Sequence, residues 1–302
     1  MEEILQAIVF GIIQGLSEFI PISSTAHLRV IPALLGWADK GAAFTAVIQL
    51  GTLIATFVYF KNDIIDLTSG FIKAIKTKKY FEDPYSRLFI LVMIGTIPIV
   101  VFGYLMKDFI KGEARGLYVI SFSLIFWAVL LYIAEKSAQH KKEFTEISFK
   151  DGIIVGLFQV LSLIPGSSRS GVTITGGLFT GMKRDVAARF SFLLSIPAIT
   201  LSGLYELYDE RQILLNENMI NLIIATVVSG IVGYYSIAFL IHFLKTRSNL
   251  IFIIYRIILA VIILILFWTG KLKNIDESEN VHNKPKTELI KNVLITDKIG
   301  FK

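Results

Sequence analysis

The residues best suited to chemistry lie in one short polar stretch between apolar segments, from Pro165 to Thr173. It reads PGSSRSGVT, so Arg169 stands among hydroxyl groups and glycines. A guanidinium group with several nearby hydroxyls suits phosphate, because its fork of N–H donors matches the oxygens of the anion. Gly166 and Gly171 would let backbone N–H groups approach an anion closely. A helix that restarts here would add the positive end of its dipole.

Two other interpretations of this stretch stay open. The fixed positive charge could line an ion path, or Arg169 could extend from an interfacial turn to lipid headgroups. A second polar stretch near the N-terminus favours the phosphate interpretation, because Glu18 and His27 flank a break in an apolar segment there. Ionisable groups inside such segments are functional candidates by default.

Together the two stretches supply the parts of a phosphoryl-transfer site: a hydroxyl nucleophile, a base, and a cation to hold the developing charge. We take Glu18, Ser24, His27 and Arg169 as the candidate catalytic residues. Ser24 and His27 are three residues apart, so a helix that starts at Ser24 would carry both on one face. The candidate substrate-binding residues are Gln14, Ser23, Thr25, Gly166, Ser167, Ser168, Ser170 and Thr173.

Glu18 could act as the base, orient His27 or bind a metal, and it is the best candidate for a metal ligand. One carboxylate together with substrate phosphate oxygens can hold Mg²⁺ or Ca²⁺. No second carboxylate stands nearby in the sequence, so a metal cage made by the protein alone is not expected. We predict no tightly bound cofactor and leave a divalent cation open.

Three glutamines lie within apolar segments. Gln14 precedes Glu18 by four residues, which places both on the same helix face. Gln14 and its counterpart Gln159 could contact phosphate or a metal-bound water, but we favour hydrogen bonds between helices for both. For Gln49 we favour packing over catalysis.

The chain as a whole has the composition of an all-α polytopic membrane protein. It has 302 residues, 54% of them hydrophobic, and its longest apolar runs can cross a bilayer. The basic residues sit mainly between these runs, so the net charge of +6 reflects membrane topology and does not indicate a nucleic-acid partner. The chain has no cysteine, which excludes disulfides and thiolate chemistry.

The apolar segments divide into two similar halves, each a hairpin of short half-helices followed by three spans. Gly11 to Gln14 resembles Gly156 to Gln159, and Pro21 to Ser24 resembles Pro165 to Ser168 with one residue of slip between. An odd number of spans per half would invert the second half, and the two re-entrant hairpins would meet near the midplane. The predicted units are a first repeat at 1–134 (hairpin 4–36, spans at about 42–60, 88–106 and 117–134), a cytoplasmic linker at 135–151, a second repeat at 152–270 (hairpin 152–181, spans at about 190–208, 219–244 and 250–268) and a flexible polar tail at 271–302.

Lysine and arginine residues favour one orientation of these spans. The predicted polar loop 61–87 holds six of them and the linker 135–151 holds four, whereas the short loops 107–116 and 209–218 hold three and one. Because cytoplasmic loops carry the excess of basic residues, the richer loops belong in the cytoplasm. Both termini then lie outside, the first hairpin enters from outside and the second from inside.

At these residues the chain resembles the bacterial undecaprenyl-diphosphatases, also called bacitracin-resistance proteins. The resemblance covers about residues 3–268, and two serine motifs in this order are quite specific to the family. The matching segments are Gln14 to Glu18, which fits the family's (E/Q)xxxE pattern, Pro21 to Leu28 (PISSTAHL), Pro165 to Thr173, 46–51 (AVIQLG) and 190–197 (FSFLLSIP).

The resemblance implies hydrolysis of undecaprenyl diphosphate to undecaprenyl phosphate and inorganic phosphate, which recycles the lipid carrier of peptidoglycan synthesis in the bacterial plasma membrane. It also implies bacitracin resistance, because that antibiotic sequesters the diphosphate form, and inverted repeats whose site opens to the extracytoplasmic side. Gln14 stands where the family pattern allows Glu, so a mechanism with two ionised carboxylates is in doubt here. The functional residues implied are Glu18, Ser24, His27 and Arg169, with less weight on Ser23, Ser168 and Thr173.

Our hypothesis is that Ser24 attacks the terminal phosphorus, assisted by Glu18 or His27, while attack by His27 or by water stays open. A lipid flippase or transporter with the same inverted-repeat site is the alternative function, and a structural scaffold would leave the ionisable residues unexplained. The expected partners are a polyprenyl diphosphate lipid and the bilayer, and a homodimer stays open. The residues expected to bind the diphosphate, with the half-helix N-termini, are Arg169, Ser168 and Thr173.

Overall fold

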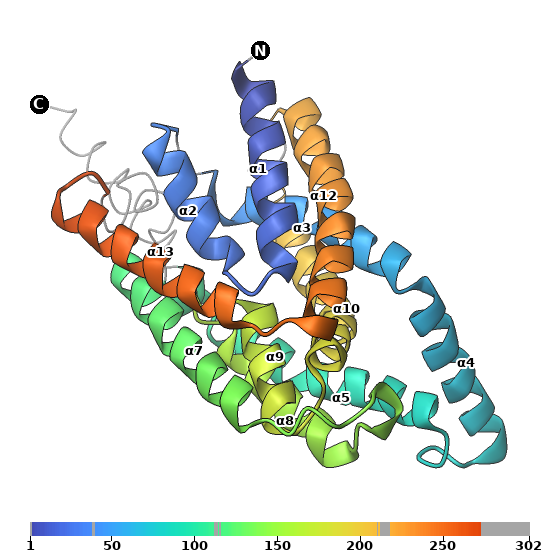
Figure 1. Cartoon of the computed structure of the whole chain (residues 1–302). Helices are drawn as coiled ribbons and strands as arrows, with labels where there is room; N and C mark the ends of the chain where they lie inside the picture. Colours follow the sequence, from blue (N-terminus) through green and yellow to red (C-terminus); the bar gives the residue numbers. More distant parts are fainter. Residues whose placement is uncertain are drawn as a thin grey trace, which may run out of the picture.

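The computed structural model is all-helical, and it describes residues 2–37, 40–111, 114, 116–209, 211 and 218–272. The predicted tail lies almost entirely outside these residues. Two helical hairpins form the middle of the molecule, hairpin 1 above hairpin 2 in the view of Figure 1. Hairpin 1 consists of α1 (Glu2–Phe19) and α2 (Ser24–Leu34), and hairpin 2 of α8 (Phe149–Leu161) and α9 (Arg169–Phe179).

Longer helices surround the hairpins. Five of those described, α5, α7, α10, α12 and α13, are long and apolar enough to cross a membrane, and α3 with α4 forms a sixth candidate span that is bent by 71°. The surrounding helices are α3 (Gly41–Tyr59), α4 (Lys61–Thr77), α5 (Pro84–Leu105), α6 (Lys107–Lys111), α7 (Leu117–Ser137), α10 (Arg184–Asp209), α12 (Met219–Thr246) and α13 (Leu250–Trp268), with a 3₁₀ turn η2 (Phe144–Glu146).

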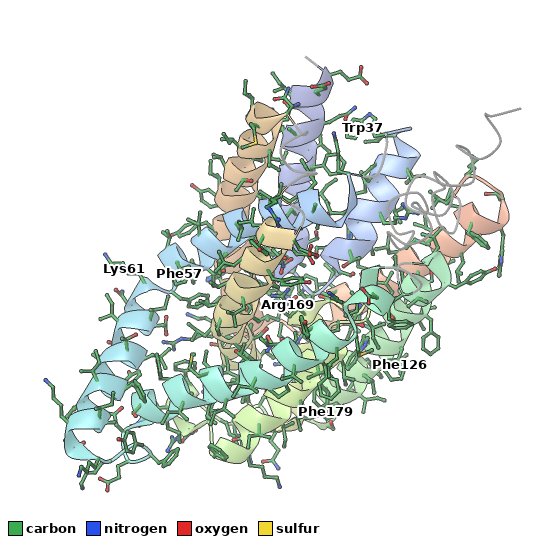
Figure 2. The ribbon with its side chains drawn as sticks, turned by 180° about the vertical axis from the view of Figure 1, so that it is seen from behind. Trp37, Phe57, Lys61, Phe126, Arg169 and Phe179 are labelled. Atoms are coloured by element: carbon green, nitrogen blue, oxygen red, sulfur yellow. The ribbon has the colours of Figure 1, made fainter. Side chains whose placement is uncertain are left out.

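The prediction of a polar loop over 61–87 is wrong for most of that range, because α4 occupies Lys61–Thr77. Its Leu67, Gly70 and Ala74 recur at helical spacing and are buried where α4 packs against α5. Because lysines lie on the other faces of α4, the mean hydropathy of this segment does not reveal its apolar stripe. Figure 2 shows the bend between α3 and α4 beside Lys61.

Other helix bounds differ from the predicted spans mainly at polar ends. α5 begins at Pro84 and α10 at Arg184, each before the first apolar residue of the predicted span. The expected short loop after α5 begins with α6. A helix does not stop where its sequence becomes polar, because its backbone hydrogen bonds continue outside the apolar layer.

The surrounding helices pack on the two hairpins in matching ways. α1 packs against α12, and α12 against α3; likewise α8 packs against α5, and α5 against α10. α7 and α13 lie side by side along one edge of the molecule (Figure 1). Each hairpin is therefore held in a groove of longer helices, with its tip directed toward the other.

Both hairpin tips end in the same serine cap. Ser23 and Ser168 precede the second helix of their hairpins with positive φ angles of 77° and 67°, a strained conformation for residues other than glycine. Each Oγ accepts a hydrogen bond of 3.3 Å from a backbone N–H of the following turn. Ser23 follows Gln14 by the same number of residues as Ser168 follows Gln159. The two hairpins therefore align without the one-residue slip that the sequence predicted between them.

Glycine lets α3 and α12 meet backbone to backbone. A Cβ added at Gly51 would lie 2.0 Å from the carbonyl oxygen of Thr226 and 3.0 Å from the backbone nitrogen of Gly230. Small residues at such contacts let membrane helices approach closely. Since backbone atoms cannot rotate aside, any side chain at Gly51 must push the two helices apart.

We expect Gly51→Ala to lower the free energy of unfolding by at least about 2 kcal/mol, because overpacking against backbone leaves no room for side-chain adjustment. The melting temperature of the purified protein in detergent measures this effect. Gly103→Ala is the matched control, because a Cβ there would meet only Leu163 Cδ2, at an ordinary 3.5 Å. Equal melting temperatures for the two variants would contradict the backbone contact.

Candidate functional site

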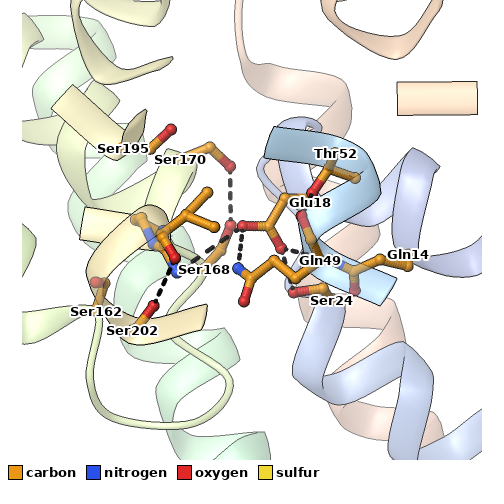
Figure 3. A network of polar contacts seen from close by, with 12 residues as sticks. Gln14, Glu18, Ser24, Gln49, Thr52, Ser162, Ser168, Ser170, Ser195 and Ser202 are labelled. Carbon is orange, nitrogen blue, oxygen red and sulfur yellow. Dashed lines mark hydrogen bonds and ion pairs between the residues drawn. The ribbon is translucent and has the colours of Figure 1, made fainter. Parts of the chain in front are cut away.

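The tips of the two hairpins meet at a polar cavity of about 150 Å³. Figure 3 shows side chains from α1, α2 and α3 facing side chains from hairpin 2. The cavity brings together six of the site residues predicted from the sequence, of which three are candidate catalytic residues and three are candidate substrate-binding residues. The lining residues are Gln14, Ser17, Glu18, Ser24, Thr25, Thr45, Gln49, Ser162, Ile164, Ser168 and Arg169.

Glu18 is the centre of the hydrogen-bond network (Figure 3). Its Oε2 accepts hydrogen bonds from Ser24 Oγ at 3.2 Å and from Gln14 Nε2 at 3.0 Å. Its Oε1 accepts one from Gln49 Nε2 at 2.8 Å and lies 3.9 Å from Nη2 of Arg169. The glutamate is only 9% exposed, so protein donors replace water around it. This geometry allows Glu18 to take the proton of the Ser24 hydroxyl.

Two buried polar atoms at the cavity have no hydrogen-bond partner among the described residues: Nη1 of Arg169 and Oε1 of Gln14. Leaving a buried guanidinium donor unsatisfied is unfavourable, and such groups in native proteins call for a specific explanation. An anion in the cavity would satisfy the arginine. The amide oxygen of Gln14 would in turn accept a hydrogen bond from the bound group or contact a cation that enters with the anion.

Ser24 and Arg169 occupy equivalent places in the two hairpins. Ser24 is the first residue of α2, and Arg169 is the first residue of α9. The open N–H groups and positive dipole ends of both helices therefore lie at the cavity. A hydroxyl group and a cation at two such helix starts form a site suited to a phosphoryl group.

His27 lies outside the cavity lining. Its Nδ1 is 2.7 Å from the carbonyl oxygen of Ser23, which can only accept, so Nδ1 carries the proton of a neutral ring. Its Nε2 then accepts a hydrogen bond of 2.6 Å from the hydroxyl of Tyr255, whose ring stacks on the imidazole. Both ring nitrogens are thus engaged with the protein, an arrangement typical of a positioning residue.

Five predicted substrate-binding residues do not line the cavity. Thr173 Oγ1 donates to the carbonyl oxygen of Arg169 at 2.7 Å and lies 2.5 Å from Ser191 Oγ, so it joins α9 to α10. Gly166 faces α7, where a Cβ would come within 2.5 Å of the carbonyl oxygen of Ile120. Thr173 and Gly166 thus support the tip of hairpin 2 from behind, whereas Ser170 lines a small adjoining pocket together with Glu18 and Arg169. The five are Ser23, Gly166, Ser167, Ser170 and Thr173.

The glutamines divide between the site and the packing. The predicted hydrogen bond between helices is confirmed for Gln159, whose Nε2 donates to the carbonyl oxygen of Gly95 at 3.3 Å. For Gln49 packing was favoured over catalysis, but its side chain donates a hydrogen bond to Glu18 and lines the cavity. Its helical spacing from Thr45, another lining residue, is the sequence signal that could have placed both on a polar face of α3.

Arg256 of α13, which sequence reasoning missed, fastens both hairpin tips. The side chain is completely buried. Nη1 donates to the carbonyl oxygen of Pro21 in hairpin 1 at 3.4 Å, and Nη2 donates to those of Gly166 and Ser167 in hairpin 2 at 3.2 and 2.9 Å. Nε donates to the carbonyl oxygen of Leu124 on α7. An ionisable residue inside an apolar span was the signal.

We expect Arg256→Met to lower the free energy of unfolding by about 3 kcal/mol or more, because several buried carbonyl groups lose their donors at once. Thermal unfolding in detergent measures this loss. Lys245→Met, in the exposed last turn of α12, is the control that removes a positive charge without touching the tips. Equal stability of the two variants would show that Arg256 does not fasten the hairpins.

The carboxylates of the site are too few for a metal cage. Among the described residues, no three His, Asp or Glu side chains are placed to hold a metal ion together. Glu18 is the one carboxylate on the cavity lining, and Gln14 donates to it through Nε2, which leaves the amide oxygen of Gln14 without a hydrogen-bond partner among the described residues. These oxygens are ligands that Mg²⁺ and Ca²⁺ accept, provided that a ligand such as a diphosphate supplies the others.

The fold and the site define a multi-pass helical membrane protein with an anion-suited cavity between two hairpin tips. Residues 7–262 match the family model described as bacitracin resistance protein BacA, and the chain belongs to this family. It is 48% identical to the undecaprenyl-diphosphatase of Myxococcus xanthus over 92% of this chain and 94% of that protein. It is 52% identical to the undecaprenyl-diphosphatase of Chloroherpeton thalassium over 90% of this chain and 99% of that protein.

Proposed function

We propose that this chain hydrolyses undecaprenyl diphosphate to undecaprenyl phosphate and inorganic phosphate in the bacterial plasma membrane. The observation that carries this function is the 3.2 Å hydrogen bond from Ser24 to Glu18 in a cavity that also presents an unsatisfied N–H of Arg169. The activity that names the relatives supports it. Such hydrolysis regenerates the lipid carrier of peptidoglycan synthesis and removes the diphosphate that bacitracin sequesters.

The terminal phosphoryl group of the substrate binds between Ser24 and Arg169. The guanidinium group and the N-termini of α2 and α9 neutralise the charge of its oxygens, an effect that is strong in a site with little water. Glu18 accepts the proton of Ser24 as the hydroxyl oxygen attacks phosphorus. The bond from phosphorus to the bridging oxygen breaks, and the bridging oxygen leaves as part of undecaprenyl phosphate.

Water completes the reaction at the phosphorylated Ser24. The proton held by Glu18 passes to the departing undecaprenyl phosphate, which restores the carboxylate. Glu18 then takes a proton from water as the water oxygen attacks phosphorus, and returns that proton to Ser24 as inorganic phosphate is released. Gln14 and Gln49, which donate to opposite carboxylate oxygens, keep Glu18 in one orientation through both steps.

A divalent cation fits this site as a companion of the diphosphate. Glu18 and the unpartnered amide oxygen of Gln14 would hold it, and a cation of this kind would withdraw charge from the phosphate oxygens. Since Gln14 replaces a second carboxylate, the protein contributes one negative charge to the binding. Affinity for the cation then depends on the bound diphosphate.

Two features of the hairpins support an inverted topology of the two halves. Gly11 with Gly156, Gln14 with Gln159 and the caps Ser23 with Ser168 correspond at one constant spacing, and the helix contacts of the two halves match in pairs. α2 and α9 have 11 residues each, about half of what a bilayer requires, so both hairpins are re-entrant. With the basic loops in the cytoplasm, the site opens to the extracytoplasmic side.

We expect Ser24→Ala and Glu18→Gln each to reduce phosphate release from undecaprenyl diphosphate by about 10³-fold. The first variant lacks the hydroxyl that attacks phosphorus, and the second lacks the carboxylate that accepts its proton. The measurement is phosphate released by purified protein, with and without chelator. Ser162→Ala is the control, since this lining hydroxyl bonds only the carbonyl oxygen of Gln159 among the described residues.

Two outcomes would change the mechanism. Ser24→Ala with near-normal activity would replace the serine nucleophile with direct attack by water, whereas a phosphoenzyme trapped in acid on Ser24 supports it, because phosphoserine survives acid and phosphohistidine does not. Folded wild-type protein that moves the lipid between leaflets but releases no phosphate would favour a flippase, which the midplane hairpins also suit.

For Tyr255→Phe we expect less than a tenfold loss of kcat, because the ring that stacks on His27 remains and only the hydroxyl donor to Nε2 is lost. Steady-state kinetics over a range of pH check this prediction. A loss as large as that of Ser24→Ala, or a shifted pH profile, would place His27 in the chemical step after all.

A further inference from the structure

An apolar groove of about 400 Å³ lies beyond the tip of hairpin 2, between α5 and α10. The helices of hairpin 2 are shorter than α5 and α10, so the hairpin fills only part of the space between them. The part beyond its tip stays open. Leu163 and Arg169 form the end of the groove at the tip, and Gly103 and Ala198 are among the small residues that leave its walls wide.

Arg169 joins the groove to the polar cavity, because its side chain lines both. The two spaces differ in chemistry: the cavity is lined mostly by hydroxyl, amide and charged groups, the groove mostly by apolar side chains. A ligand that fills both must have an anionic head and an apolar chain attached directly to it. A free phosphate would fill only the cavity.

The far end of the groove has the residues of a membrane interface. Lys107 Nζ lies 3.3 Å from the hydroxyl of Tyr205 and 5.5 Å from the ring centre of Tyr104, and all three line the groove. Tyrosine and lysine are typical of the level where lipid headgroups begin. The groove therefore lies at the depth of lipid chains, between this interface and the hairpin tips.

We propose that this groove binds the first isoprenoid units of the polyprenyl chain while the diphosphate occupies the cavity at Arg169, an assignment that rests on the proposed function. The diphosphate and its chain are one continuous molecule, so a chain leaving the cavity past Arg169 enters the groove directly. The remaining units of the chain extend into the bilayer.

The absence of cysteine from the chain allows a direct test of occupancy. Gly103→Cys places one thiol in the groove, where a Cβ has room. Val101→Cys, on an exposed face of the same helix, is the matched control. Each variant is labelled in phospholipid nanodiscs with an apolar thiosulfonate reagent, alone or with farnesyl methylenediphosphonate, whose bridging carbon resists hydrolysis.

We expect the farnesyl analogue to slow labelling of Gly103→Cys by about tenfold and to leave Val101→Cys unchanged. Methylenediphosphonate without a chain should protect neither thiol. Inhibition of wild-type phosphate release by the analogue establishes that it is bound. Inhibition without protection would overturn the proposal, and so would a Gly103→Cys thiol that is already protected by the phospholipid, because the groove would then hold an ordinary acyl chain.

A kinetic test separates this proposal from the proposed function. Gly103→Leu should raise KM for undecaprenyl diphosphate by about tenfold, the effect of excluding roughly two methylene-sized groups from burial, while inhibition by methylenediphosphonate stays unchanged. Unchanged KM would overturn the groove assignment alone. Wild-type protein that releases no phosphate would overturn the proposed function, yet protection of Gly103→Cys would still show isoprenoid binding.

Discussion

The site depends on one buried arginine, Arg256, which is paired with backbone carbonyl groups and with no carboxylate among the described residues. Both hairpin tips contain non-helical backbone, whose carbonyl groups need donors when water is excluded. Arg256 supplies those donors to Pro21 in one tip and to Gly166 and Ser167 in the other. Because a guanidinium group is planar and carries several N–H donors in fixed directions, it sets the distance between the tips and hence the width of the cavity.

The two hairpins use the same backbone for different chemistry. Each tip has a strained serine cap followed by a helix start. At that first helical position hairpin 1 carries Ser24, and hairpin 2 carries Arg169. The positive ends of both helices therefore lie at the same cavity, which suits an anion. The different residues at this equivalent position place a hydroxyl group on one side of the cavity and a guanidinium group on the other, and Glu18 of hairpin 1 accepts the hydrogen bond from Ser24.

An amphiphilic substrate requires a polar space and an apolar space that touch. The hairpins provide both, because their tips enclose a polar cavity and an apolar groove stays open beyond the tip of hairpin 2. Arg169 stands at the boundary of the two spaces.

The sequence by itself determined the helical membrane class, because the backbone of a long apolar run satisfies its hydrogen bonds within a bilayer by forming a helix. The last such run, α13, has the predicted bounds. It also indicated the two polar tips and the ionisable residues in them. Local pattern missed the amphipathic α4, whose lysines masked its buried stripe. Only the tertiary structure decided that Gln49 binds Glu18, that Tyr255 engages His27 and that Arg256 joins the tips. These partners are far apart in the chain, and helix packing, which no local spacing records, brings them together.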